Sequence, residues 1–401
     1  ANLGNNAGGL ETLTVSDITD ITATASELNK LDGVTATKDE LNLVDGSVSG
    51  QLSHRNMIIN GAMEVCQRVS EDTLVEITAG SGVKAVDRWK LWEGTDGSYQ
   101  AKQAIPLGAI PGFERTLYVS PNNADTNIQS NQYALVGQVI EAKNLTHIGV
   151  GTASAKPLTL SFYIRSNLTG TMNAYIAKYN NTRIIPLEFD LPSSAGTWER
   201  IELTAPALTS GGIIGASNGL GFEVIWTLAI GSTFKIGTNG TWGSNSNGLA
   251  TSNHNVNFMS STSNYIEITG VQLELGSVAT PFEHRSYADE LKRCQRYFEQ
   301  LMTSDGGSFL CSGFNYSASQ PQGVVRFQTD KRATPTMGYT TGIAYQATGE
   351  NSRTNVTPIF YIPSINCVMV YASTSGLTAG QGVNLNNRDD GAGRVFAEAE
   401  L

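Results

Sequence analysis

Carboxylates on expected strands are the residues of this chain whose type could do chemistry. The candidates are Glu188, Asp190, Glu199, Glu202, Glu223, Glu267 and Glu274. Glycoside hydrolysis requires two carboxyl groups about 5–9.5 Å apart, and Glu188 and Asp190 are spaced to share one face of a strand. Isolated acidic residues on the solvent face of a sheet are, however, the usual case. The carboxylates alone therefore do not predict catalysis.

Histidines and cysteines, the usual partners of nucleophiles and metals, are scattered along the chain. They are His54, His147, His254, His284, Cys66, Cys294, Cys311 and Cys367. No CxxC pair, HExxH or P-loop motif occurs. The polar turn 386–391 has oxygen ligands for calcium but lacks their alternating spacing, so a plain turn fits it better. We expect a chain that is not an enzyme, folds in a reducing cytosol without disulfides, and has no catalytic residue, cofactor or metal site.

Aromatic and amide side chains near turns favour sugar binding instead, because sugars stack on ring faces and hydrogen-bond to amides. Trp242 lies in the polar loop 237–248, where an indole has no obvious core to enter. The open alternative is a tryptophan tucked under its own turn or into a neighbouring subunit. The predicted ligand-binding residues are Trp242, Asn245, Tyr179, Asn180, Tyr316 and Tyr339. The tryptophans within strand-like runs are expected in the core: Trp89, Trp198 and Trp226.

Composition excludes several classes of protein. The 401 residues include 26 Lys and Arg against 36 Asp and Glu, a net charge of −10. A nucleic-acid-binding surface needs clustered basic residues. A membrane-spanning helix needs about 20 apolar residues, whereas the longest largely apolar run here is Val224–Ile230. We therefore expect no nucleic-acid partner and no membrane insertion.

The sequence begins with a thirteen-residue repeat, Thr22–Val34 followed by Thr35–Ser47. Each unit starts with a Thr and a Glu at capping-box spacing and ends near a glycine, which predicts a helix of about two turns. Helices this short are unstable alone and must bury their apolar face against something else. We expect identical copies around a symmetry axis, with a flexible linker as the alternative. The predicted trimerisation residues are Leu28, Leu31, Leu41 and Val44.

From about residue 56 the hydrophobic period changes to two, and polar clusters separate the apolar runs. Expected strands before residue 280 are 57–59, 62–68, 83–92, 115–119, 132–141, 158–166, 172–179, 198–203, 222–230 and 265–275. Residues 287–301 have apolar positions at helical spacing and predict an amphipathic helix of about four turns. Expected strands after it are 309–314, 324–327, 357–362, 366–371 and 394–399.

These patterns predict a mainly β chain with four parts. The first is a short helical trimeric shaft over 1–53, and the second a jelly-roll β-sandwich, resembling carbohydrate-binding domains, over 54–286. A connecting amphipathic helix over 287–303 and a smaller C-terminal β-sandwich forming the tip over 304–401 complete the expected order.

Several stretches resemble the tail fibres of bacteriophages, notably phages of cyanobacteria and other marine bacteria. Residues Thr22–Gly46 are similar to the repeat of fibre shafts. Similar to the distal domain of such fibres are Arg55–Val65, Val86–Trp89, Val271–Ser277, Ala279–Tyr287, Cys294–Tyr297 and Arg332–Thr336. These anchors cover most of the chain between residues 22 and 336, whereas the loops between them differ among fibres and do not identify a ligand.

The resemblance implies a homotrimeric virion protein, made in the host cytoplasm and joined to tail or adaptor proteins through a region upstream of Ala1. We expect an adhesin that recognises a bacterial surface glycan, lipopolysaccharide or capsule, for host attachment. Two alternatives stay open: a glycan-depolymerising tail spike, and a structural spacer without receptor binding. Since an acidic chain is repelled by an anionic envelope, bridging by a divalent cation such as calcium is a further hypothesis.

Overall fold

The computed structural model describes residues 24, 26, 54–83, 85–178, 183–244, 246–303, 308–341, 343–349, 353–387 and 393–401. The chain divides into two compact units, Ala1–Gly50 and Gln51–Leu401, and every described strand belongs to the second. The predicted trimerisation residues, Leu28, Leu31, Leu41 and Val44, lie outside the described residues. The helical shaft and the finer domain boundaries therefore stay predictions.

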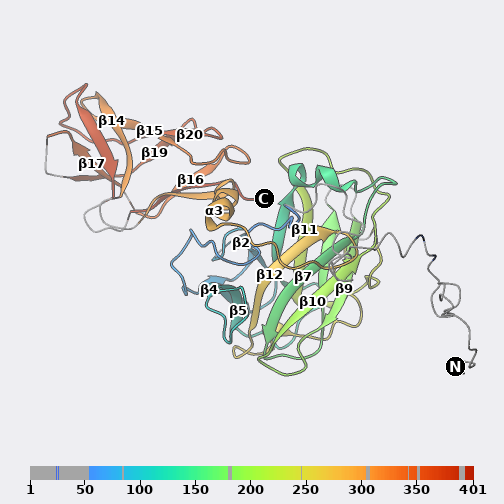
Figure 1. Ribbon diagram of the computed structural model, residues 1–401. Helices are drawn as coiled ribbons and strands as arrows, with labels where there is room; N and C mark the ends of the chain where they lie inside the picture. Colours follow the sequence, from blue (N-terminus) through green and yellow to red (C-terminus); the bar gives the residue numbers. More distant parts are fainter. Residues whose placement is uncertain are drawn as a thin grey trace, which may run out of the picture. The chain divides into compact units, whose positions relative to one another are not determined.

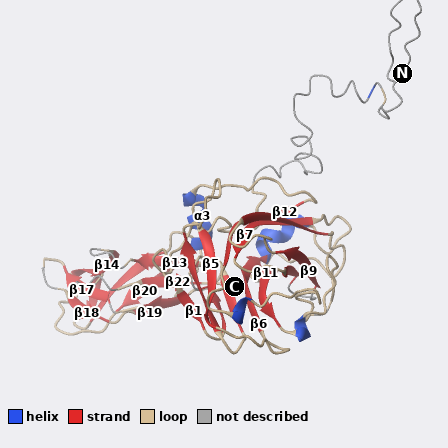
Figure 2. Ribbon diagram, turned by 90° about the horizontal axis from the view of Figure 1, so that it is seen from below, coloured by secondary structure: helices blue, strands red, loops and turns tan. Residues whose placement is uncertain are grey.

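The first part of the second unit is a sandwich of two six-stranded antiparallel sheets (Figure 1). Sheet A has the order β1 (Val75–Ile77), β4 (Ser98–Ala104), β5 (Thr116–Asn123), β12 (Ile266–Leu275), β7 (Leu158–Ser166), β10 (Trp198–Ala205). Sheet B has the order β2 (Gly80–Val83), β3 (Lys90–Glu93), β6 (Tyr133–Glu141), β11 (Leu220–Ile230), β8 (Thr171–Lys178), β9 (Arg183–Asp190). The expected mainly β architecture with a jelly-roll-like sandwich is confirmed. Figure 2 shows how fully strands dominate, with short helical segments at their ends.

Aromatic side chains from both sheets fill the core of the sandwich. The ring of Trp226 on β11 lies 5.8 Å from that of Trp89 and 5.0 Å from that of Phe162, which comes from β7 of sheet A. Large rings bury much apolar area and interlock edge to face, so they fix the spacing of the two layers. The core positions expected for Trp89 and Trp226 are confirmed.

The expected strands 57–59 and 62–68 are wrong, because residues 54–74 form turns and irregular backbone. Side chains satisfy part of the backbone here, and single hydrogen bonds to β12 and β4 replace a continuous strand ladder. The Asn56 side chain accepts from the amide of Ile58, and the Asn60 side chain both donates to the carbonyl of Val65 and accepts from its amide. Asn60 also takes a positive φ of 59°, which an asparagine tolerates better than most residues. The Asn-Gly signal therefore marks a buried turn.

The connecting helix is shorter than expected. Helix α3 spans Tyr287–Gln295 and begins at Ser286, whose hydroxyl accepts from the amide of Asp289. Residues Phe298–Met302 form strand β13 and pair with β22 (Val395–Glu398). The four-turn prediction over 287–301 is wrong at its end, because pairing with a strand from the far end of the chain outweighs the helical periodicity.

Two further antiparallel sheets follow α3 and form what we call the C-terminal module, residues 298–401. Its three-stranded sheet has the order β13, β22, β16 (Thr336–Tyr339). Its seven-stranded sheet has the order β18 (Thr354–Val356), β17 (Ile343–Ala347), β21 (Gly382–Asn386), β14 (Phe309–Ser317), β15 (Gln320–Arg326), β20 (Cys367–Tyr371), β19 (Ile359–Tyr361). One hydrophobic cluster takes residues from both, including Met302 and Val395 from the first and Val325 and Val370 from the second.

Ion pairs join the C-terminal module to the sandwich. Arg68 contacts Glu398 at 3.0 Å and Glu400 at 3.1 Å, and the buried Arg88 also pairs with Glu400. Just before the module, Arg296 at the end of α3 donates to Glu141 at the end of β6 at 2.7 Å. Arg88, Arg68 and Glu400 are at most 12% exposed, so breaking one of their pairs would leave a poorly solvated charge without a partner.

Candidate functional site

A row of large polar and aromatic side chains crosses the outer face of sheet A. Strand pairing places Lys102 opposite Tyr118, Tyr118 opposite Glu267, Glu267 opposite Arg165, and Arg165 opposite Trp198. Directly opposite residues on paired strands share one face. Residues next to them along β4, β5, β7 and β12 are in the core: Ala101, Leu117, Val119, Ile164, Ile266 and Ile268. Trp198 was expected in the core. That expectation is wrong, because its register with Arg165 turns the indole outward, where it packs on a smaller cluster with Ile110 and Phe113.

A groove with a volume of about 440 Å³ lies over one end of this row. Its floor includes Tyr118 and Glu267, and its walls include Lys102, Ile105 and Leu107. This volume is within the range of small-molecule sites. The groove therefore has room for one or two sugar rings.

Glu267 is fully buried at the floor of the groove. Its Oε1 atom accepts from the guanidinium of Arg165 at 2.6 Å, and its Oε2 atom accepts weakly from the Thr116 hydroxyl at 3.3 Å. Burial raises the pKa of Glu267, and the hydrogen bond and charge of Arg165 oppose that rise. The carboxylate is thus held by Arg165 through Oε1 and by the Thr116 hydroxyl and the Leu107 amide through Oε2, and its side chain has no exposed surface.

Two exposed ion pairs form the rim. Lys102 contacts Asp72 at 2.5 Å, and Arg115 contacts Glu71 at 3.1 Å. Exposed pairs of this kind contribute about 0–1 kcal/mol. The Lys and Arg head groups can therefore exchange these partners for polar groups of a ligand at little cost.

The groove also offers an apolar wall and an aromatic ring. Ile105 is 70% exposed and Leu107 is 56% exposed, which is unusual for aliphatic side chains lying side by side. The indole N–H of Trp198 donates to the carbonyl of Leu107 at 3.2 Å and so fixes this wall. The half-buried Tyr118 ring lies nearly parallel to that of Tyr265, at 13° and 5.9 Å between centroids. An apolar wall beside a tyrosine suits the C–H face of a sugar.

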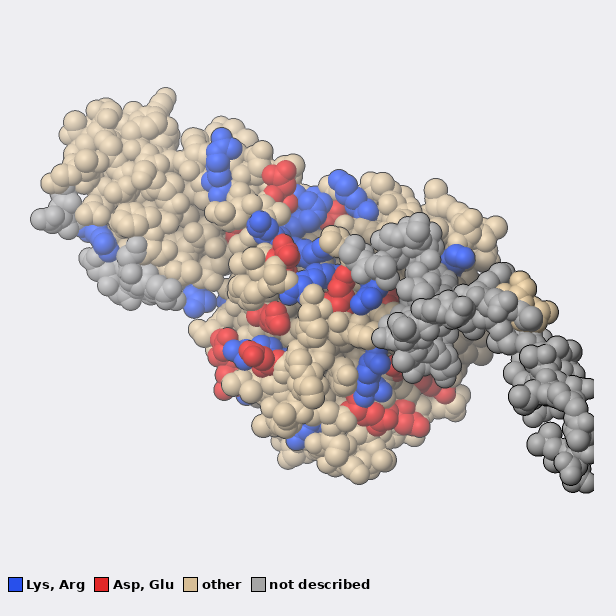
Figure 3. Space-filling model, viewed as in Figure 1, with Lys and Arg blue, Asp and Glu red and all other residues tan. Residues whose placement is uncertain are grey.

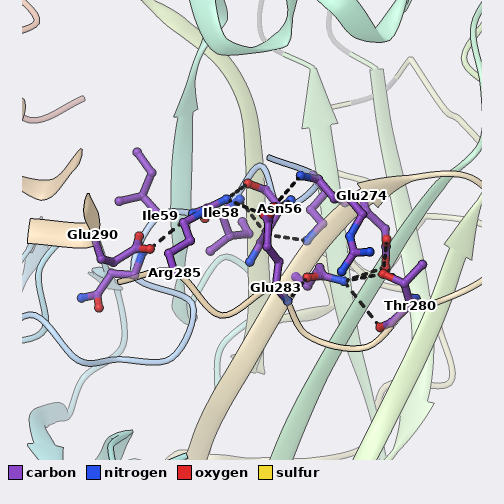
Figure 4. A network of polar contacts seen from close by, with 12 residues as sticks. Asn56, Ile58, Ile59, Glu274, Thr280, Glu283, Arg285 and Glu290 are labelled. Carbon is purple, nitrogen blue, oxygen red and sulfur yellow. Dashed lines mark hydrogen bonds and ion pairs between the residues drawn. The ribbon is translucent and has the colours of Figure 1, made fainter. Parts of the chain in front are cut away.

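A polar network joins residues 56–59 to residues 274–290 (Figure 4). Glu283 accepts from the amide of Asn56 at 2.9 Å and from Arg285 at 3.1 Å, and Arg285 also donates to the carbonyl of Ile58 at 3.0 Å. Burial raises the pKa of Glu283, but the amide of Asn56 and the charge of Arg285 outweigh it, so the pKa is lowered. The carboxylate of Glu283 therefore stays ionised near neutral pH.

The stretches that resemble tail fibres meet in and beside this network. Asn56 donates to the carbonyl of Val271 at 2.9 Å, and Asn60 donates to the carbonyl of Asp87 at 3.0 Å. Residues from 55–65, 86–89, 271–277 and 279–287 are thus brought together by buried hydrogen bonds. These motifs close the sandwich, and the groove is built from other residues.

The ligand-binding residues predicted from the sequence do not meet at one place. Trp242 is half-buried against the sandwich core, and its indole N–H donates to the carbonyl of Pro206 at 2.7 Å. Tyr316 is exposed on β14, and Tyr339, exposed on β16, has its ring 6.3 Å from that of Phe360. Outside the described residues lie Asn245, Tyr179 and Asn180. Trp242, Tyr316 and Tyr339 are not among the residues that line the groove.

The groove was not predicted from the sequence, because its residues become neighbours only through the register of strand pairing. Of its residues, Glu267 appeared only among strand carboxylates. Tyr118 and Lys102 carry no motif, and their proximity follows from the pairing of β4 with β5. The one available signal was alternation, which places Lys102 and Tyr118 on the polar faces of their strands.

We searched the described part of the chain for metal sites and for membrane-spanning helices. Within it, no group of three or more His, Cys, Asp and Glu side chains could hold a metal ion. Nor does any described helix have the length and hydrophobicity to cross a bilayer.

Comparison with known proteins finds no matching family model and no matching curated protein. Similar solved structures include the enzymatically active domain of tailspike protein 4 of bacteriophage CBA120, with a TM-score of 0.30 and 13% identity over 55% of this chain and 21% of that one. They also include the family 11 carbohydrate-binding module of Clostridium thermocellum bound to a mixed-linked tetrasaccharide, with a TM-score of 0.27 and 13% identity over 51% and 100%. The xylan-binding domain of Paenibacillus barcinonensis Xyn10C has a TM-score of 0.26 and 8% identity over 53% and 99%. The chain spans about a fifth of the tailspike chain, and at these TM-scores no function is inferred from the similarity.

Proposed function

We propose that this chain is a glycan-binding adhesin that holds sugar residues in the groove of sheet A. The observation that carries the proposal is the composition of the groove. It combines the Tyr118 ring, the exposed aliphatic wall of Ile105 and Leu107, and the hydrogen-bonding groups of Lys102 and Arg115 in about 440 Å³. Sugars present an apolar C–H face and a rim of hydroxyls, and both features find partners here.

The arrangement suits binding of moderate strength. Tyr118 packs against the C–H face of a ring, while Lys102 and Arg115 donate to hydroxyl oxygens. A single site of this kind binds weakly. Three copies in a homotrimer would raise the attachment strength through effective concentration, and the repeat at 22–47 is what supports such a trimer.

The role in a phage tail fibre is supported by the sequence resemblance over residues 22–336. On this proposal the protein is made in the host cytoplasm, is incorporated into the virion, and contacts tail or adaptor proteins through its N-terminal side. Its ligand is a bacterial surface polysaccharide, lipopolysaccharide or capsule. Within this proposal, Trp242, Tyr316 and Tyr339 remain candidates for secondary contacts.

We propose binding without cleavage, because Glu267 is sequestered by Arg165 beneath the groove floor. One observation favours the alternative of a glycan-cleaving tail spike. The pKa of Glu267 is raised by burial, as a general acid requires, and Glu71 and Asp72 line the same groove. The two functions differ in whether the protein cleaves the glycan that it binds.

A glycan array probed with the full chain, followed by incubation with purified host polysaccharide, separates these functions. We expect retention of a defined set of bacterial glycans and an unchanged chain length of the polysaccharide. A fall in chain length would establish cleavage. Absence of binding to every glycan and to host cells would favour the structural spacer.

A further inference from the structure

The two cations at the rim of the groove are anchored by contacts other than their ion pairs. Nη1 of Arg115 donates to the carbonyl of Glu114 at 3.0 Å. Nζ of Lys102 lies 5.3 Å from the centroid of the Tyr118 ring, which is a cation–π distance. Lys102 and Arg115, which we call the rim cations, therefore keep their positions in the groove when their acidic partners leave.

The acidic partners lie on the solvent side of the rim cations. Glu71 is 63% exposed and Asp72 is 75% exposed, whereas the two cations are 26% and 22% exposed. Nη2 of Arg115 lies 3.1 Å from both carboxylate oxygens of Glu71. Each pair thus has an inner cation and an outer carboxylate, and we call Glu71 and Asp72 the rim carboxylates. A ligand that arrives from solvent meets the rim carboxylates first.

A tight turn keeps the rim carboxylates close to the groove. The amide of Thr73 donates to the carbonyl of Ser70 at 3.2 Å, and the amide of Asp72 donates to the carbonyl of Gln103 on β4 at 3.0 Å. Asp72 has a φ of 62°, a conformation that aspartate adopts more readily than most residues. Because the backbone is held to the sheet, only the two side chains have to turn to uncover the rim cations. The rim carboxylates therefore act as a competitor of high effective concentration.

The charges of the rim cancel while the ion pairs are closed. Two cations face two carboxylates, and the buried Glu267 is balanced by Arg165. Where Figure 1 labels β4 and β5, red and blue side chains lie next to one another on the surface in Figure 3. Turning the rim carboxylates outward leaves two positive charges at the groove, on a chain whose net charge is −10. The opened groove therefore attracts an anion.

The two ion pairs also determine which ligand gains most from opening the groove. A sugar hydroxyl that replaces a rim carboxylate exchanges a charge-assisted contact for a weaker neutral one. A carboxylate of the ligand replaces like with like, and its sugar ring adds contacts with Tyr118 and the aliphatic wall. The rim carboxylates thus display the ligand chemistry that the rim cations accept.

We propose that the groove of sheet A is specific for an acidic saccharide, one whose ring carboxylate, as in a uronic acid, displaces the rim carboxylates from the rim cations. This inference rests on the proposed function and names the class of glycan that the groove binds. It also supplies a direct contact between an acidic protein and an anionic envelope, because the ligand meets two positive charges within a chain that repels it elsewhere.

Calorimetric titration of the full chain with an oligosaccharide of uronic acid and with its methyl ester tests the proposal. The ester keeps the ring and the hydroxyls and loses only the negative charge. We expect the dissociation constant of the ester to be about tenfold higher, because the groove shields the pair between ligand carboxylate and rim cation from water more than the exposed rim pairs are shielded. Binding of the acid should also weaken as salt is added.

Variants of the rim distinguish displacement from simple contact. Glu71→Gln/Asp72→Asn removes the competitor and should lower the dissociation constant of the acid about threefold. Arg115→Gln should raise it about tenfold and should affect the ester less. The matched control Glu199→Gln/Glu202→Gln removes the same two charges from exposed positions of β10 and should bind the acid like the wild type. Thermal unfolding of each variant checks that the fold is intact.

Three outcomes contradict the account, at two different levels. Equal affinity for the acid and its ester would overturn the proposed specificity, and so would a Glu71→Gln/Asp72→Asn variant that binds the acid no more tightly than the wild type. Retention of neutral or basic glycans alone on the array would overturn this inference and leave the proposed function standing. Absence of binding to every glycan would overturn the proposed function itself.

Discussion

The guanidinium of Arg165 donates a 2.6 Å hydrogen bond to the fully buried carboxylate of Glu267, beneath the groove of sheet A. The pair connects β7 with β12 at the centre of the sheet. It therefore stabilises the pairing of the two strands beneath the groove.

Breaking this pair should destabilise the protein. Glu267→Ala leaves the guanidinium of Arg165 with an uncompensated charge at low exposure, so we expect the free energy of unfolding to fall by about 3 kcal/mol. Glu202→Ala is the control, because Glu202 pairs with Arg200 at an exposed position and should cost less than about 1 kcal/mol. Urea unfolding followed by fluorescence measures both. Equal losses in the two variants would show that burial of the Arg165–Glu267 pair has no energetic consequence.

Gly137 on β6 is predicted to be irreplaceable. A Cβ atom there would lie 2.2 Å from the carbonyl oxygen of Val224 and 2.7 Å from the Cα of Ile225, both backbone atoms of β11. Gly137→Ala should lower the free energy of unfolding by at least about 2 kcal/mol, because strands β6 and β11 must separate to accept the methyl group. Gly215→Ala, where a Cβ meets nothing within 4 Å, should change stability by less than about 0.5 kcal/mol. The same denaturation experiment compares them, and a neutral Gly137→Ala would contradict the tight approach of the two strands.

His254 should make the protein sensitive to mild acid. Burial, with a smaller contribution from the charge of Lys235, lowers the pKa of His254 to about 4. In the unfolded chain the pKa is about 6.5. Between these values the unfolded state binds a proton that the native state does not, so stability is lost as pH falls from about 6.5 to 4, by up to about 3 kcal/mol.

The pH dependence of unfolding in His254→Gln is the matching control. The free energy of unfolding of this variant should vary less between pH 4 and 7 than that of the wild type, whatever its absolute value. Parallel curves for the two proteins would mean that another group causes the loss.

The variant Trp242→Ala tests whether this tryptophan has a structural role or a ligand-binding role. Because its ring packs on the core and its N–H donates to the carbonyl of Pro206, Trp242→Ala should lower the free energy of unfolding by about 2–4 kcal/mol. The binding role predicted from the sequence requires instead a weaker binding to host cells at unchanged stability. Thermal unfolding and cell binding of the same variant, measured together, decide between the two.

Sequence reasoning located strands well where apolar and polar residues alternate. The run 158–166 was predicted and is β7 at the same bounds. It missed β4, Ser98–Ala104, because the core-facing Ala101 gives a weak hydrophobic signal among Ser, Gln and Lys. It gave no bounds to β9, Arg183–Asp190, although Glu188 and Asp190 were considered as strand carboxylates. This strand contains Pro186, a residue that argues against a strand except at a sheet edge, where β9 lies.

The groove could not be predicted because it is a product of pairing. Lys102, Tyr118 and Glu267 are separated by up to 165 residues along the chain and become neighbours only through the order of β4, β5 and β12. Loop composition directed attention to Trp242, whose indole instead finds a backbone partner. Residue types and their local spacing were therefore enough to predict the fold class. Predicting the groove would have required the register of the paired strands.

Calorimetric titration of the wild type and of Tyr118→Ala with a glycan retained on the array tests the central claim most directly. Removing the ring takes away one stacking contact and should raise the dissociation constant about tenfold. Tyr287→Ala, at an exposed tyrosine of α3, is the control and should bind like the wild type. Equal affinity of wild type and Tyr118→Ala, with the fold intact, would contradict the assignment of the groove as the glycan site.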